Sequence, residues 1–230
     1  MREIVFDTET TGLSFPGGDR LVEIGCVELV NRVPTGRSFH AYLNPERRMP
    51  AEAFAVHGLS DVFLSDKPLF PDICEKLLEF LGDCPLVAHN ASFDFGFLNG
   101  ELGRCGRPQV HGDRMVDTLT IARVRHPGAK HTLDALCTRY GIDLCQRTVH
   151  GALLDAQLLA QVYVELTGGR QITLGLVEDA PVMPETPREA PSRVHVRPAR
   201  PFAATRAELE RHAAFVATLE SPLWHAAASS

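Results

Sequence analysis

The chain has 230 residues, of which 44% are hydrophobic and 23% charged, a composition that excludes disorder along its whole length. It contains no apolar run of the ~18 residues that a membrane helix needs, and its N-terminus lacks a signal-peptide pattern, so we expect neither a membrane span nor export. The formal net charge of −6 and the pI of about 5.9 argue against a protein that holds nucleic acid by bulk charge alone.

The first 168 residues alternate apolar runs with turn signals. Predicted strands occupy residues 4–7, 21–30, 38–43 and 85–89. Predicted helices occupy residues 51–57, 73–81, 92–102, 116–123, 132–140 and 152–167. Early strands followed by alternating strands and helices predict an α/β fold, in which a mixed sheet is flanked by helices.

The composition changes near residue 168. Residues 180–201 carry six prolines and few large apolar side chains, which is typical of a flexible linker. Thr205 and Glu208 then form a capping-box pattern that opens a predicted helical segment over about 205–225. We therefore divide the chain into a globular domain (1–168), a short segment (169–177), a linker (178–204) and a helical tail (205–230).

The six cysteines are scattered and form no C-x-x-C pair. This spacing predicts neither a structural zinc site nor a disulfide framework, and it favours the reducing cytoplasm.

The first chemical signal is a pair of acids, Asp7 and Glu9, at the end of a predicted strand. Residues i and i+2 of a strand point to the same face, so the two carboxylates lie side by side. Such a pair repels unless it shares a cation or a proton, and Mg²⁺ prefers these hard oxygen ligands. Taken alone, such a pair is more often two exposed surface acids than a cation site.

Three further residues are candidates for the same site. Asp94 falls in the first turn of a predicted helix, where the helix dipole alone could explain a carboxylate. His150 and Asp155 are five residues apart, which on one regular helix would point them in different directions. They can share a site if His150 lies on the loop before the helix, and Gly151 makes that break plausible. Alone, His150 could be an ordinary exposed loop histidine.

The combination resembles the DEDDh family of 3′→5′ exonucleases, which have an RNase H-like fold. The resemblance covers about residues 2–168 and is specific, because all five catalytic positions are present. The segments that carry it are IVFDTETTGL (4–13), LVEIGCVE (21–28), VHGLSD (56–61), VAHNASFD (87–94), HTLDAL (131–136) and HGALLD (150–155). Within the family the chain is most similar to the proofreading subunits of bacterial DNA polymerase III.

The resemblance implies roles for particular residues. Two divalent ions, Mg²⁺ or Mn²⁺, are expected on the four carboxylates Asp7, Glu9, Asp94 and Asp155, with His150 as the general base. The substrate-binding residues expected from the family are Thr10, Thr11, Gly12, Leu13, His57, His89, Asn90 and Phe93. Structural alternatives exist for three of them, because Leu13 and Phe93 could belong to the core and Asn90 could be only a helix cap.

The resemblance also predicts partners for the tail. Gln171, Leu174 and Leu176 match a short sliding-clamp-binding pattern, although the same leucines could instead form a strand packed on the globular domain. In the family the final segment binds the polymerase catalytic (alpha) subunit, and a lone helix of this kind is only marginally stable without a partner. Its candidate docking residues are Leu209, Ala213, Val216, Leu219 and Leu223.

Three other functions compete with proofreading of a DNA primer 3′ end. A free-standing DEDDh enzyme acting on RNA or single-stranded DNA ends would have the same site but no need of the tail. An aspartyl-phosphate phosphatase would require a second Asp where Glu9 stands and would leave Asp94, His150 and Asp155 unexplained. A non-enzymatic scaffold bridging clamp and polymerase would be signalled by loss of a catalytic residue, and none is lost.

The net charge is unevenly distributed. Residues 169–230 carry seven basic and seven acidic side chains, so the whole of the −6 belongs to residues 1–168. We expect such an acidic domain to bind DNA weakly by itself and to depend on its partners to raise its effective concentration at the primer end.

Overall fold

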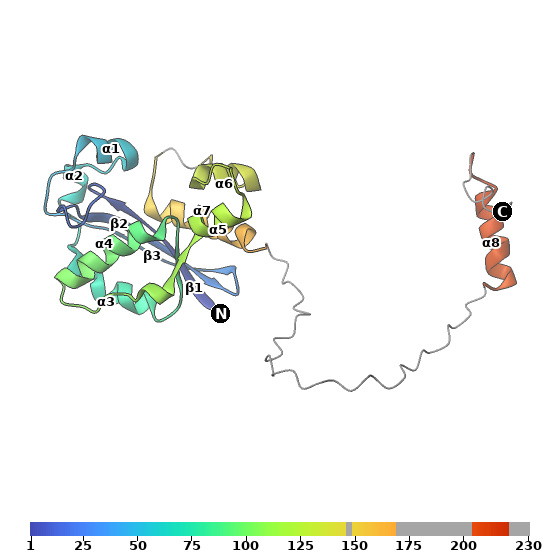
Figure 1. Ribbon diagram of the computed structural model, residues 1–230, viewed down its shortest axis with the longest axis horizontal. Coiled ribbons are helices and arrows are strands. Elements are labelled where there is room, and N and C mark those ends of the chain that lie inside the picture. The colour runs from blue at the N-terminus through green and yellow to red at the C-terminus, as the bar shows by residue number, and fades with distance from the viewer. Residues whose placement is uncertain (146–148, 169–203, 221–230) are drawn as a thin grey trace, which may run out of the picture. The chain divides into compact units, whose positions relative to one another are not determined.

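A computed structural model describes residues 1–145, 149–168 and 204–220 (Figure 1). The chain divides into two units, Met1–Leu176 and Val177–Ser230. The segment boundaries predicted at 169 and 178 lie outside the described residues and stay predictions.

The larger unit is built on a five-stranded mixed sheet of order β3-β2-β1-β4-β5. β1 pairs with β2, and β2 with β3, in antiparallel fashion, whereas β1, β4 and β5 run parallel. The strands are β1 (Arg2–Thr10), β2 (Leu21–Val30), β3 (Val33–Tyr42), β4 (Leu86–Ala88) and β5 (Met115–Asp117). This arrangement confirms the predicted α/β fold with a mixed sheet.

Helices cover both faces of the sheet because successive residues of β1 point to opposite sides. Ile4 and Phe6 belong to a core with α3 (Phe70–Leu81) and α4 (Ala91–Arg104). Val5 belongs to a second core with helices of the other face. Those helices are α5 (Thr118–Arg125), α6 (Leu133–Tyr140) and α7 (Ala152–Leu166).

The predicted helix over 116–123 is wrong at its start. Residues Met115–Asp117 form β5, which pairs in parallel with β4, and the helix begins only at Thr118. The Asp117 side chain accepts a hydrogen bond from the Leu119 amide and so caps α5. A three-residue strand is too short to show an alternating pattern, which is why the periodicity merged it with the helix.

Other elements also differ from the prediction. β1 is longer at both ends than 4–7, and β3 begins at Val33 rather than at 38 because the Asn31 and Arg32 backbones, both with positive φ, form a tight hairpin turn. The polar, exposed start of β3 carries no apolar alternation. The prediction also omitted a four-residue helix, α2 (Asp61–Leu64), which follows α1 (Ala51–His57).

The second unit contains α8 (Arg206–Val216), which begins with the predicted capping box of Thr205 and Glu208. The helix is shorter than the predicted 205–225, since Leu219 lies beyond its end. The Thr218 hydroxyl bonds the Phe215 carbonyl there and competes with continued helix. Leu223 lies outside the described residues.

All six cysteines lie in the described parts of the chain, and none of them forms a disulfide. Across the described ranges, no helix combines the length and apolar character needed to cross a bilayer.

Candidate active site

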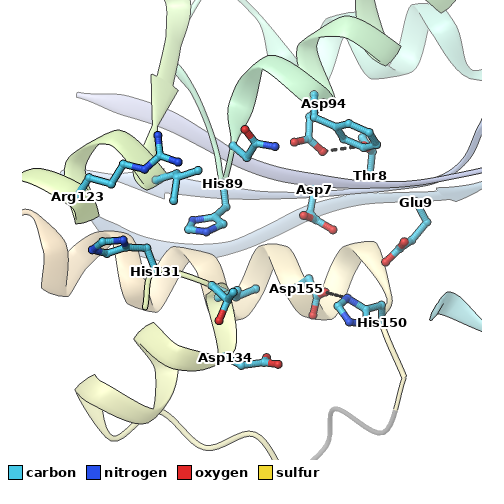
Figure 2. Close-up of a pocket in the computed structure, with 15 residues that line it drawn as sticks. Asp7, Thr8, Glu9, His89, Asp94, Arg123, His131, Asp134, His150 and Asp155 are labelled. Carbon is cyan, nitrogen blue, oxygen red and sulfur yellow. Dashed lines mark hydrogen bonds and ion pairs between the residues drawn. The ribbon is translucent and has the colours of Figure 1, made fainter. Parts of the chain in front are cut away.

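A cleft of about 770 Å³ lies where the end of β1 meets α4, α5, α6 and α7 (Figure 2). All five predicted catalytic residues line it: Asp7, Glu9, Asp94, His150 and Asp155. Segments far apart in the sequence therefore converge on one opening.

Asp7 and Glu9 lie on the face of β1 that meets α7 (Figure 2). Their spacing of two residues places both carboxylates on this face, as the sequence indicated. Glu9 is buried and Asp7 half-buried. Two adjacent carboxylates at the end of a buried strand favour a bound cation.

Gly25 of β2 lets α7 approach this face closely. It pairs with Asp7 across the β1–β2 ladder, and a Cβ built on it would lie less than 3.0 Å from the backbone of Leu153. Any side chain here would push the first turn of α7 away from the sheet. Because Gly25 has no side chain, this first turn of α7, which carries Asp155, can pack directly against the sheet.

His150 precedes α7, and Asp155 lies in its first turn, as the break at Gly151 predicted. The Nδ1 atom of His150 is 3.2 Å from Oδ2 of Asp155 (Figure 2). The carboxylate is buried, whereas 47% of the His150 side chain is exposed. The amide of His150 also donates to the Val56 carbonyl at 3.3 Å, which ties its loop to α1.

Asp94 lies in the first turn of α4 and reaches the cleft from the opposite face of the sheet. The Thr8 hydroxyl, which points to that face of β1, donates a hydrogen bond to Asp94 Oδ1 at 2.7 Å. Burial raises the pKa of the Asp94 carboxyl to about 7, although the Thr8 hydrogen bond favours the charged form. A cation in the cleft would offset the cost of this buried charge.

The donor set of the cleft fits a divalent cation. One ligand atom each from Glu9, His150 and Asp155 lies within 4.8 Å of the others, and Asp7 and Asp94 line the same space. Carboxylate oxygens are the ligands that Mg²⁺ and Mn²⁺ prefer. His150 is close enough to be a ligand as well as a base.

Thr10 is the last residue of β1, and the loop that follows carries Thr11, Gly12 and Leu13; none of the four lines the cleft. Leu13 is 87% exposed, which excludes the core alternative for it. It lines a neighbouring groove of about 580 Å³ together with Phe93. Phe93 lines both spaces and also packs against the core through Phe97, so packing in the core does not remove it from the wall of the cleft.

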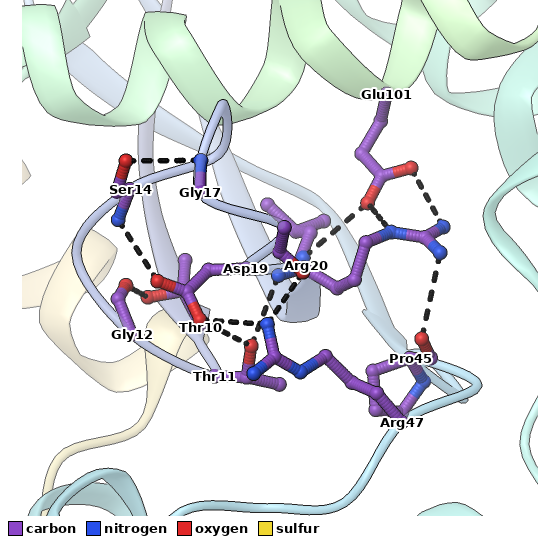
Figure 3. A network of polar contacts seen from close by, with 12 residues as sticks. Thr10, Thr11, Gly12, Ser14, Gly17, Asp19, Arg20, Pro45, Arg47 and Glu101 are labelled. Carbon is purple, nitrogen blue, oxygen red and sulfur yellow. Dashed lines mark hydrogen bonds and ion pairs between the residues drawn. The ribbon is translucent and has the colours of Figure 1, made fainter.

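Asp19 organises this loop (Figure 3). Its carboxylate accepts hydrogen bonds from the Ser14 amide at 3.0 Å and from the Thr11 hydroxyl at 3.3 Å, and it pairs with Arg47 at 2.8 Å. A Cβ on Gly12 would lie less than 3.0 Å from the same carboxylate, so a larger residue at position 12 would require the Asp19 side chain to move.

Arg20 anchors the far end of the loop to α4 (Figure 3). Its guanidinium bonds both carboxylate oxygens of Glu101, at 2.6 and 2.9 Å. Glu101 is almost fully buried, and a bidentate pair of this kind fixes direction as well as position.

His89 and Asn90 line the cleft at the start of α4. The Thr118 hydroxyl donates to the Ala88 carbonyl at 3.1 Å, so it accepts from His89 Nδ1 at 2.9 Å, which fixes the proton of the neutral ring on that nitrogen. Asn90 has a left-handed backbone and its side chain does not cap α4, which excludes the cap alternative. The Asp117 carboxylate instead accepts from the Asn90 and Ala91 amides.

His57 is a substrate-binding candidate that does not reach the cleft in the structure. It is buried at the end of α1 and does not line the cleft. Its Nδ1 accepts from the Leu59 amide at 3.1 Å, and burial lowers its pKa. Among the described residues, its buried Nε2 has no hydrogen-bond partner.

The sequence analysis missed several residues of the site. Thr8 positions Asp94, Asp117 and Thr118 hold the start of α4, and three other side chains line the cleft: Arg123, His131 and Asp134. The Asp117-Thr118 pair did offer a signal, since Asp before Thr is a typical helix start.

The tail candidates are only partly described. Gln171, Leu174 and Leu176 lie outside the described residues. On α8, Leu209 is 58% exposed and Val216 is buried, and Ala213 lies on the same helix.

The chain is similar in sequence to known exonucleases. A family model described as "Exonuclease" matches residues 4–163. A protein of Rickettsia felis named DNA polymerase III subunit epsilon is 47% identical over 225 residues, which span 95% of this chain and 97% of that protein. The protein of the same name from Escherichia coli K12 is 48% identical over 176 residues, 74% of this chain and 72% of that one.

Solved structures of exonucleases are also similar to this chain. Exonuclease X in complex with 5′-overhanging duplex DNA is 26% identical, with a TM-score of 0.56, and the match covers 72% of this chain and 90% of that one. A complex of Escherichia coli ExoI with single-stranded DNA has a TM-score of 0.63 at 16% identity, over 74% of this chain and 41% of that one. The second likeness supports the fold alone.

Proposed function

The chain belongs to the exonuclease family, and we propose from this premise that it is the proofreading 3′→5′ exodeoxyribonuclease of a bacterial replicative DNA polymerase. The observation that carries the proposal is the 47% identity to a DNA polymerase III subunit epsilon over nearly the full length of both chains. The enzyme would remove misincorporated nucleotides from a primer 3′ end as 5′-nucleoside monophosphates.

The site supports hydrolysis of a phosphodiester. Two divalent ions, Mg²⁺ or Mn²⁺, held by Asp7, Glu9, Asp94 and Asp155 would neutralise charge on the phosphate and leaving oxygen and lower the pKa of the attacking water. With Nδ1 of His150 donating to Asp155, its Nε2 accepts the proton of that water. The exposure of His150 then allows the proton to pass to solvent.

The residues around the cleft suit a terminal nucleotide. His89, Asn90 and Phe93 line the cleft, and Phe93 offers a ring on which a base can stack. Thr10, Thr11 and Gly12 lead into Leu13, which lines the neighbouring groove, and His57 follows Val56, whose carbonyl accepts a hydrogen bond from the His150 amide. These contacts involve few charges, so the affinity for DNA is expected to be modest.

One experiment separates the proposal from its competitors. Purified protein is given primer–template DNA with a mismatched or a paired 3′ end, and a matched RNA primer, with Mg²⁺, Mn²⁺ or EDTA. We expect metal-dependent release of mononucleotides, faster from mismatched DNA. A preference for RNA would support the free-standing RNase, and no release with any metal would support the scaffold.

The partners are part of the same proposal. We assign the clamp-binding role to Gln171, Leu174 and Leu176 and polymerase docking to the 205–230 tail, acting in the cytoplasm. The Gln171→Ala/Leu174→Ala variant should lose retention on immobilised sliding clamp. Deleting residues 178–230 should abolish co-purification with the polymerase catalytic subunit and leave nuclease activity on single strands. Unchanged binding in either case rejects that assignment.

A further inference from the structure

The described residues contain an unusual group of cations on α5, α6 and the loop that joins them. Within residues 118–142 there are four basic side chains and one acidic one, Asp134, in a domain that is otherwise acidic. The basic residues are Arg123, Arg125, Lys130 and Arg139, and all four are exposed. In the described part of the chain none of the four forms an ion pair, whereas Arg2, Arg20 and Arg47 each bind a carboxylate.

This basic surface continues into the active-site cleft. Arg123 and His131 line the cleft beside His89, at the end away from His150 (Figure 2). Nε2 of His131 lies 2.7 Å from the His126 carbonyl, which carries the surface outward along the joining loop. The same cleft that holds the acidic cluster at one end is therefore rimmed by positive charge at the other.

The charges act on one another across this surface. The ring of His126 bonds the Tyr140 hydroxyl at 2.7 Å, which brings the ends of α5 and α6 together. Burial lowers the pKa of the His126 ring, and the guanidinium groups of Arg139 and Arg125 lower it further. Such a surface favours an anion over a cation or a neutral partner.

We infer that this basic surface binds the phosphate backbone of the single strand just upstream of the nucleotide in the cleft. The inference rests on the proposed function, which places a 3′ end at the carboxylates. A strand of more than one nucleotide must leave the cleft, and phosphates are most stable along the rim where unpaired cations meet the opening. The loop of Leu13, by contrast, offers an apolar groove and no row of cations.

The test compares two double charge reversals of the full-length protein. Arg125→Glu/Arg139→Glu changes the surface at residues outside the cleft lining. Arg48→Glu/Arg104→Glu makes the same change in net charge on exposed arginines elsewhere, Arg104 lying on α4. Binding of a fluorescent single-stranded 12-mer is measured by anisotropy with Ca²⁺ over a range of KCl. Hydrolysis is measured on the same oligonucleotide and on thymidine 5′-(p-nitrophenyl phosphate), which has no upstream phosphate.

We expect the surface variant to raise the Kd for the oligonucleotide about tenfold at low salt and to flatten its salt dependence by about one phosphate contact. Its ratio of kcat/KM for oligonucleotide to ester should fall by a similar factor, and the control variant should keep the wild-type ratio. Equal effects of both variants, or no effect of either, would overturn the inference. Unchanged oligonucleotide binding with lost polymerase binding would also overturn it, and would assign the surface to a protein partner. A wild type that binds through this surface but hydrolyses neither substrate would refute the proposed function alone.

Discussion

Gly25 on β2 and Leu153 on α7 are in such close contact that the two backbones leave no room for a Cβ between them. Gly25 lies opposite Asp7, and Leu153 is two residues before Asp155. The contact thus sets the distance between two of the carboxylates that the cleft brings together.

Gly25→Ala should therefore damage stability and activity at once. We expect a loss of about 1–3 kcal/mol in unfolding free energy from overpacking against backbone that cannot rotate away. We also expect at least a tenfold fall in kcat on single-stranded DNA, because Asp155 moves with its helix. Denaturant unfolding and steady-state kinetics check both. Gly96→Ala, on α4 with open space at its Cβ, is the control and should be neutral or slightly stabilising.

Thr8 is expected to matter only through its hydroxyl. Thr8→Val keeps the shape but leaves the buried Asp94 carboxylate without its 2.7 Å hydrogen bond. The loss of such a bond to a charged group costs about 1.5–3 kcal/mol. We expect weaker Mn²⁺ binding by calorimetry and about a tenfold lower kcat, with Thr8→Ser restoring most of both. A Thr8→Val enzyme as active as the wild type would show that Asp94 needs no such support.

The raised pKa of Asp94 predicts how the metal-free protein responds to pH. Its folded pKa of about 7 lies above the ordinary value of 3.8, so the folded state favours the protonated form. Stability from this group is fully present below about pH 4 and is lost as the pH rises through about 7. Asp94→Asn should therefore raise the melting temperature in EDTA at pH 8 by roughly 5 °C.

At pH 4 the same substitution should give no such gain, because the wild-type carboxyl is then protonated. Saturating Mn²⁺ should stabilise the wild type and not Asp94→Asn, since binding to the folded state alone adds stability. A pH-independent difference between the two proteins would exclude Asp94 as the titrating group.

Much of this site follows from sequence periodicity, and the remainder depends on contacts with no period. The two-residue spacing of Asp7 and Glu9 fixes a shared face, and Gly151 separates His150 from its helix, so both placements could be predicted. The role of Thr8 could not be predicted, because the same alternation places its side chain on the opposite face of the strand. Its contact with Asp94 exists only in the folded chain. The three-residue β5 and the contacts of Asp19 could not be predicted either, because neither follows a periodic sequence pattern.

His150 can be tested as a base rather than a ligand. His150→Ala should lower kcat on single-stranded DNA by about 10²–10⁴-fold, the usual contribution of a general base. It should leave the Mn²⁺ affinity within about threefold of wild type, because the four carboxylates remain. Calorimetry decides, since loss of metal binding in this variant would make His150 a ligand, as its distance to Glu9 and Asp155 also allows.

Asp19 provides a final test, of the loop rather than of the chemistry. Asp19→Ala removes the acceptor for the Ser14 amide and the partner of Arg47 and frees the turn at Gly12 and Leu13. Because the carboxylate cluster is untouched, we expect KM for a single-stranded oligonucleotide to rise about fivefold with kcat changed less than twofold, which corresponds to about 1 kcal/mol of lost binding. Asp66→Ala removes an exposed pair with Lys67 and serves as the matched control. A fall in kcat with unchanged KM would mean that the loop acts on the reacting phosphate itself rather than on the seating of the terminal nucleotide.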